Sequence, residues 1–126
     1  MIYRIFFLLL FVALLGLYKL FSSSRTDSRL DRVLLSNPII LDVRSPAEFQ
    51  KGHMNEAINI PIDSIEFVPL NKFDSTRPII TYCSHGVRSI RAVGLLKSRG
   101  LKYVYNGGSW EDLVTRLEDH KHRSAK

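Results

Sequence analysis

The segment Pro78-Ile79-Ile80-Thr81-Tyr82-Cys83-Ser84-His85-Gly86-Val87-Arg88-Ser89 decides the fold, because it joins a short apolar run, a polar loop and the start of a helical pattern. The apolar run at 79–82 is typical of a buried strand, and Ile90, Val93 and Leu96 then recur at helical spacing. A strand that leads through a short loop into a helix is typical of parallel sheets with crossover helices. The segment therefore predicts an α/β fold.

The chain beyond Pro38 repeats this alternation of short apolar runs and helical patterns. We expect strands at Ile39–Val43, Ala57–Ile60, Ile79–Tyr82 and Lys102–Tyr105, and helices at Arg29–Ser36, Pro46–Lys51, Arg88–Ser98 and Trp110–Asp119. Ser45 followed by Glu48 three residues later is typical of a capping box at a helix start. Together these patterns predict a small parallel sheet flanked by helices around one modest core.

Cys83 is the only cysteine and stands at the predicted end of a strand. The loop N–H groups, the positive end of the next helix and the Arg88 guanidinium would all favour negative charge on its sulfur. A lone cysteine is more often a small buried apolar residue, but the polar loop and Arg88 favour a reactive thiolate here. One cysteine excludes an internal disulfide and a multi-cysteine metal cluster.

Polar residues at the other strand ends should surround this thiol, since ligands of open α/β sheets lie beyond the carboxyl edge. Asp42, Arg44 and the segment Tyr105-Asn106-Gly107-Gly108, which we expect to form a turn, fall at that edge. We expect Asp42 and Arg44 to be structural supports, joined as an ion pair or bonded to loops. Gly86 permits a backbone conformation that other residues avoid, so the loop amides can surround a small anion or a persulfide on Cys83.

The N-terminal segment has a different character from the rest of the chain. Ile5 to Tyr18 is an uncharged, mostly apolar run of 14 residues between Arg4 and Lys19. This length suits a signal-peptide core, but extension to Phe21 predicts a membrane anchor over residues 1–21. The basic residues that follow the run favour a single-pass protein of the bacterial inner membrane with a cytoplasmic domain. A periplasmic domain released by signal cleavage is the alternative.

The charge and composition of the chain indicate which classes of partner it can bind. The net charge is +6, and without Arg4 and Lys19 the remaining 16 basic and 12 acidic residues leave +4, which suits a small anionic substrate or an anionic membrane surface. Nucleic acid is not expected, because no basic patch interleaved with aromatic residues and no groove-reading motif occurs. His120 and His122 alone are a poor metal site, so we expect neither metal nor cofactor. The expected layout is an anchor or signal segment at 1–21, a linker at 22–29, the domain at 30–120 and a basic tail at 121–126.

Four ordered motifs resemble the rhodanese family. Leu41–Phe49, with Gly52-His53-Met54 and Glu56-Ala57-Ile58-Asn59-Ile60-Pro61, resembles the front half of that domain, Tyr82–Ser89 its active-site loop, and Asn106-Gly107-Gly108-Ser109-Trp110 its closing signature. The resemblance is to the short, single-domain bacterial sulfurtransferases of the phage-shock protein E type. It implies the rhodanese-like three-layer fold. No clear strand precedes Leu30, which is a departure from longer relatives.

The resemblance also implies a mechanism. Cys83 would attack a small anionic sulfur donor such as thiosulfate, become a persulfide and release sulfite, and a thiol or cyanide would then accept the sulfur. The residues implied to bind the substrate and the persulfide are Ser84, His85, Gly86, Val87, Arg88 and Ser89. Ser89 is placed either to cap the helix, which we favour, or to donate to sulfur.

Other functions are compatible with a cysteine loop that ends in arginine. Cysteine phosphatases and arsenate reductases place five residues between the two, whereas four residues, Ser84 to Val87, separate Cys83 from Arg88 here. The tighter loop favours sulfur over phosphate. A non-enzymatic binding module, or a persulfide relay to a membrane partner, is the second alternative, and the presence of both Cys83 and Arg88 argues against a pure scaffold.

Overall fold

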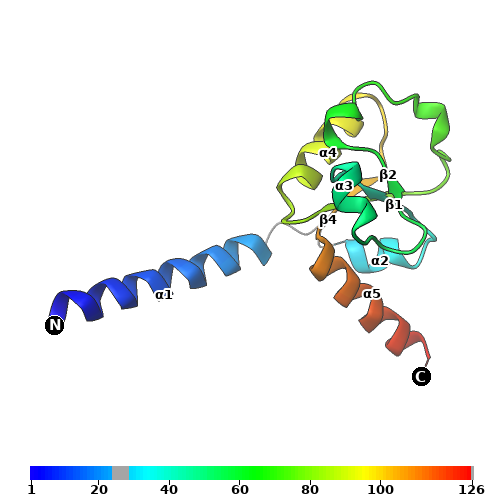
Figure 1. The fold of residues 1–126 in the computed structure, drawn as a ribbon. Helices are drawn as coiled ribbons and strands as arrows, with labels where there is room; N and C mark the ends of the chain where they lie inside the picture. Colours follow the sequence, from blue (N-terminus) through cyan, green and yellow to red (C-terminus); the bar gives the residue numbers. More distant parts are fainter. Residues whose placement is uncertain (24–28, 126) are drawn as a thin grey trace.

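The computed structural model describes residues 1–23 and 29–125, and its domain is built on four strands. The strands are β1 (Ile39–Asp42), β2 (Ile58–Asn59), β3 (Ile79–Cys83) and β4 (Val104–Ser109). The helices are α1 (Ile2–Ser23), α2 (Leu30–Leu34), α3 (Pro46–Gln50), α4 (Val87–Ser98) and α5 (Trp110–Ser124), with short 3₁₀ turns η1 (Ile62–Ser64) and η2 (Leu70–Lys72). Figure 1 shows the sheet with α4 on one side and α2 and α5 on the other.

All strand pairs are parallel, in the order β2-β1-β3-β4, so the predicted sheet is confirmed. Side chains alternate across the sheet, and Ile79 joins the cluster on the α4 side while Ile80 joins the cluster with α2 and α5. Helices therefore cover both faces, which gives three layers (Figure 1). This is the three-layer α/β architecture that the motifs predicted.

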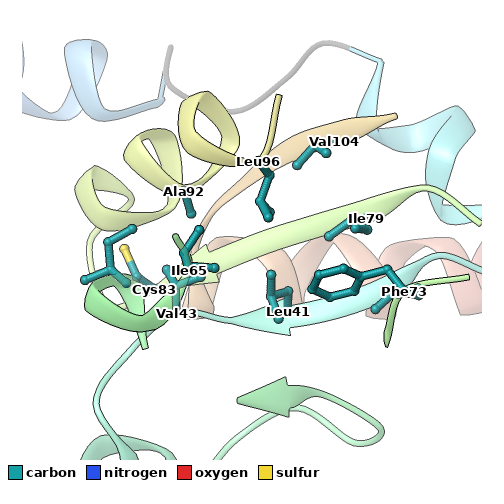
Figure 2. Close-up of a cluster of buried hydrophobic side chains, with 11 residues drawn as sticks. Leu41, Val43, Ile65, Phe73, Ile79, Cys83, Ala92, Leu96 and Val104 are labelled. Carbon is teal, nitrogen blue, oxygen red and sulfur yellow. The ribbon is translucent and has the colours of Figure 1, made fainter. Parts of the chain in front are cut away.

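The larger core cluster lies between the sheet and α4. Figure 2 shows that it draws on β1, β3, β4, α4 and the long connection from β2 to β3. Arg99 holds that connection, because its guanidinium donates to the carbonyls of Ile65 at 2.7 Å and Val68 at 2.8 Å. Cys83 is a member of this cluster, at the end nearest the start of α4.

The last strand differs from the sequence expectation. Residues 105–108, predicted as a turn, lie within β4. A bulge accommodates them: Thr81 pairs with Asn106, but Cys83 pairs with Ser109. The Asn106 side chain supports the bulge, since its Oδ1 accepts the N–H of Gly108 at 3.0 Å.

Helix ends largely follow the predicted signals. Ser45 and Glu48 form the predicted capping box at α3, and Ser109 caps α5 by accepting the N–H of Asp112. Helix α5 continues to Ser124, so most of the predicted basic tail is helical. Basic side chains in its last turn favour this extension, because they complement the negative end of the helix dipole.

Helix α1 forms over the apolar N-terminal run and lies apart from the sheet (Figure 1). Its large apolar side chains are exposed through Tyr18. Within the described residues, the structure contains no helix whose length and apolar character would suffice to cross a membrane. The membrane anchor and membrane partner predicted for residues 1–21 are therefore not supported. Arg4 and Lys19 confine the uncharged run to 14 residues, about 21 Å of helix against a hydrocarbon core of about 30 Å.

Candidate active site

The Cys83 sulfur lies between the end of β3 and the first turn of α4. The residue is only 1% exposed, and the N–H of Gly86 donates to Sγ at 3.0 Å. Gly86 is also the N-cap of α4, so the sulfur sits at the positive end of a 12-residue helix. Both features favour negative charge on the Cys83 sulfur, or on an atom that is covalently bonded to it.

Gly86 has the left-handed backbone conformation that the sequence led us to expect, with φ of +87°. A Cβ at this position would lie 3.5 Å from the Gly108 Cα, because the loop crosses the β4 bulge at close range. The left-handed turn brings the Gly86 N–H back toward the sulfur. A residue with a side chain would be strained in this conformation.

Arg88 binds a carboxylate. Its Nη1 and Nη2 donate to Oε2 and Oε1 of Glu48, each at 2.8 Å, and Nη2 also lies 3.2 Å from the Ser84 hydroxyl. The pKa of Arg88 is raised, first by the hydrogen bonds to Glu48 and further by the nearby Cys83 sulfur. The charge of the guanidinium is therefore already paired with Glu48, and the predicted contact of Arg88 with the Cys83 sulfur stays a prediction.

Glu48 is the site residue that sequence reasoning missed. Besides Arg88, its carboxylate accepts the N–H of Ser45 at 2.9 Å and the hydroxyl of Ser84 at 2.9 Å. These bonds lower the pKa of Glu48 well below its usual range, with Arg88 the largest cause. The capping box correctly predicted the contact with Ser45, but nothing local indicated the contact with a loop 40 residues away.

Ser89 is fully buried and serves a different purpose from the two that the sequence suggested. Gly86 is the N-cap of α4 and no side chain caps that helix end. The Ser89 hydroxyl lies 2.8 Å from the Gly86 carbonyl and 2.7 Å from Oδ1 of Asn106. Ser89 thus ties the start of α4 to the β4 bulge and fixes the loop beneath the sulfur.

The remaining loop residues form the rim of the site. His85 and Val87 are both exposed, and Val87 is 60% exposed. Ser84 is half-buried and bonds to Glu48. The structure therefore brings Ser84, Gly86 and Arg88 around Cys83, while His85 and Val87 face solvent.

Asp42 and Arg44 form a buried ion pair at the same edge, with Nη2 of Arg44 2.6 Å from Oδ2 of Asp42. Arg44 also donates to the Gly52 carbonyl at 2.8 Å and lies 4.3 Å above the Trp110 ring. Asn59 donates to the backbone carbonyls of both residues, at 3.1 and 3.0 Å. The predicted ion pair is therefore present and joins the ends of β1 and β2 to α5, while its role in supporting the site stays a prediction.

Known proteins share the sequence and the fold of this domain. Residues 26–113 match the rhodanese-like domain family. The chain belongs to the rhodanese family. A structure described as rhodanese with anions from E. coli superimposes with a TM-score of 0.56 at 30% identity, covering 60% of this chain and 89% of the other.

Curated relatives of this rhodanese domain include sulfurtransferases. The thiosulfate sulfurtransferase PspE of Escherichia coli is 32% identical over 75 residues, 59% of this chain and 72% of that protein. The tRNA sulfurtransferase of Thermoplasma acidophilum is 30% identical over 95 residues, 75% of this chain but only 18% of that protein. Proteins named tRNA uridine(34) hydroxylase also match, over 21–24% of their length. The family relationship thus supports sulfur transfer in general, although the chain spans only part of several relatives.

Proposed function

We propose that this rhodanese domain is a sulfurtransferase that carries sulfane sulfur as a persulfide on Cys83. The observation that carries the proposal is the N–H of Gly86, which points at Sγ from 3.0 Å at the start of α4. A terminal persulfide sulfur bears negative charge, and a helix N-terminus with an inward amide stabilises such charge. Arg88 follows in the first turn of the same helix, with its guanidinium paired to Glu48.

The proposed reaction has two displacement steps. The Cys83 thiolate attacks the outer sulfur of thiosulfate, the sulfur–sulfur bond of the donor breaks, and sulfite leaves with the bonding electron pair. The product is Cys83–S–S⁻. An acceptor thiolate or cyanide then attacks the outer sulfur of the persulfide, and the Cys83 thiolate leaves. Each step transfers one sulfur atom, and the cysteine ends the cycle as it began.

The loop also argues for sulfur rather than phosphate as the group transferred. Four residues separate Cys83 from Arg88, and the Gly86 amide is already directed at Sγ. Cysteine phosphatases place five residues between the cysteine and the arginine, a longer loop that surrounds a tetrahedral phosphate. Here the Arg88 guanidinium is held by Glu48 in a two-point ion pair.

Intact-protein mass spectrometry tests the proposal. Incubation with thiosulfate should add one sulfur, about 32 Da, in nearly stoichiometric yield, with release of one equivalent of sulfite. Cys83→Ser should abolish both signals, whereas Ser98→Ala, at the far end of α4, should leave them unchanged. Phosphate release from an aryl phosphate without any persulfide would instead identify a phosphatase. Absence of any covalent product would favour a binding module.

A further inference from the structure

The arginine that follows the Cys83 loop has its charge paired within the site itself. Glu48 holds Arg88 by two bonds of 2.8 Å, and both side chains are 35% exposed, so an incoming donor meets the carboxylate together with the guanidinium. We propose that Glu48 is a specificity-determining residue that makes the Cys83 loop favour weakly charged sulfur donors over dianions. This inference rests on the proposed sulfurtransferase function and concerns the choice of donor.

Simple electrostatics gives the direction of the effect. An unpaired guanidinium beside Cys83 would attract a dianion such as thiosulfate more strongly than a monoanion. A carboxylate in direct contact with that guanidinium cancels most of its field and repels the second charge of a dianion. The pair therefore favours a donor with one negative charge and an apolar body, which suits the exposed Val87 at the rim.

Glu48 is also held firmly enough to keep this role while a donor binds. Its carboxylate bonds to the N–H of Ser45 at 2.9 Å, and its own N–H donates to the Ser45 hydroxyl at 3.2 Å. The Ser84 hydroxyl holds the other oxygen at 2.9 Å. Moving Glu48 away from Arg88 would break these bonds. The carboxylate therefore stays beside the guanidinium while a donor anion binds.

A comparison of two donors that react by the same step distinguishes a change in donor selectivity from a general loss of activity. Thiosulfate is a dianion, and benzenethiosulfonate is a monoanion with an apolar ring. Both lose their outer sulfur to a thiolate, and sulfite or benzenesulfinate leaves with the electron pair of the broken sulfur–sulfur bond. The informative quantity is the ratio of kcat/KM for thiosulfate to kcat/KM for benzenethiosulfonate.

Glu48→Gln is the test variant, since glutamine also forms capping boxes and α3 should persist. We expect the ratio to rise about fivefold at low ionic strength, mainly through a lower KM for thiosulfate. The rise should shrink near 1 M salt, where the screening length is about 3 Å. Glu48→Asp keeps the charge, so its ratio should stay near the wild-type value even if turnover falls.

Asp31→Asn is the matched control. Asp31 pairs with Arg116 between α2 and α5, so this variant makes the same change in net charge without altering the Cys83 loop. Its ratio should equal that of the wild type. An unchanged ratio in Glu48→Gln, including equal relative losses of kcat/KM for both donors, would overturn the inference. Glu48 would then be a positioning residue for Arg88. Failure of the wild type to form a persulfide from either donor would instead contradict the proposed function.

Discussion

Asp42 and Glu48 each bind an arginine at the carboxyl edge of the sheet, but they differ in exposure. Asp42 is 0% exposed and Arg44 only 4%, whereas Glu48 and Arg88 are each 35% exposed. Removing one member of a buried pair leaves a charge without compensation, while an exposed pair is screened by water. The first pair should therefore govern stability and the second should govern the chemistry of the loop.

Asp42→Asn tests the buried pair. We expect a loss of about 3–5 kcal/mol in the free energy of unfolding, because Arg44 would remain buried beside a neutral amide. Urea denaturation of the variant measures this loss. Asp31→Asn removes the partly exposed pair with Arg116 and should cost less than about 1 kcal/mol. Similar losses in the two variants would contradict the role assigned to burial.

The Glu48 carboxylate should make stability depend on pH in acid. Its pKa is lowered in the folded chain, with Arg88 the first cause, so the folded state favours the charged form. Its contribution is present above the ordinary value of 4.5 and is lost as the pH falls through the lowered folded value. Wild type should therefore exceed Glu48→Gln in stability at pH 7, and the difference should shrink at pH 3. A difference that grows in acid would contradict this sign.

At the scale of an element, α4 has one glycine at its N-cap and another in its interior, and the two have opposite requirements. Gly86 at its N-cap has φ of +87°, whereas Gly94 lies inside the helix, and a Cβ added there would meet nothing within 4 Å. A side chain at Gly86 is strained, and a side chain at Gly94 lowers the entropy of the unfolded chain. The same chemical change should therefore have opposite effects at these two positions of one element.

Gly86→Ala should destabilise the domain by about 1–2 kcal/mol and reduce persulfide yield, since the amide directed at Sγ would move. Gly94→Ala should stabilise the domain by about 0.5–1 kcal/mol and leave the yield unchanged. Thermal unfolding and the thiosulfate mass assay measure both quantities. Loss of yield in Gly94→Ala would show that the assay reports helix packing rather than the geometry of the loop.

Elements governed by local signals were predictable from the sequence, and those governed by distant contacts were not. The α3 capping box and the left-handed Gly86 follow from short-range chemistry. Gly107, in the extended part of β4, packs against residues distant in the sequence, since an added Cβ would lie 2.9 Å from Ile80 Cγ2 and 3.0 Å from Leu113 Cδ2. The Glu48–Arg88 bond likewise joins residues 40 positions apart, a separation at which no local pattern applies.

At the scale of the whole molecule, the domain and α1 are separable in their contributions to stability. Large apolar side chains of α1 are exposed through Tyr18, and among the residues whose burial the structure describes, the core clusters begin at Leu30. Deletion of residues 1–23 should change the free energy of unfolding by less than about 0.5 kcal/mol. It should also reduce self-association, because a contiguous apolar surface is removed.

Urea denaturation and light scattering of the truncated chain measure these two effects. Leu113→Ala provides the contrast, because Leu113 is 0% exposed and its truncation should cost about 2–5 kcal/mol. A large loss of stability on deletion of residues 1–23 would show that α1 contributes to the folded domain.

The two outer strands of the sheet have a further consequence. β2 is only two residues long, and β4 is interrupted by the bulge opposite Thr81 and Cys83. An edge strand that is short or irregular offers a second chain few backbone groups for pairing, so such edges resist amyloid-like growth. The irregular strand beside the thiol thus also protects the domain against edge-to-edge polymerisation, which would matter wherever many copies are crowded together.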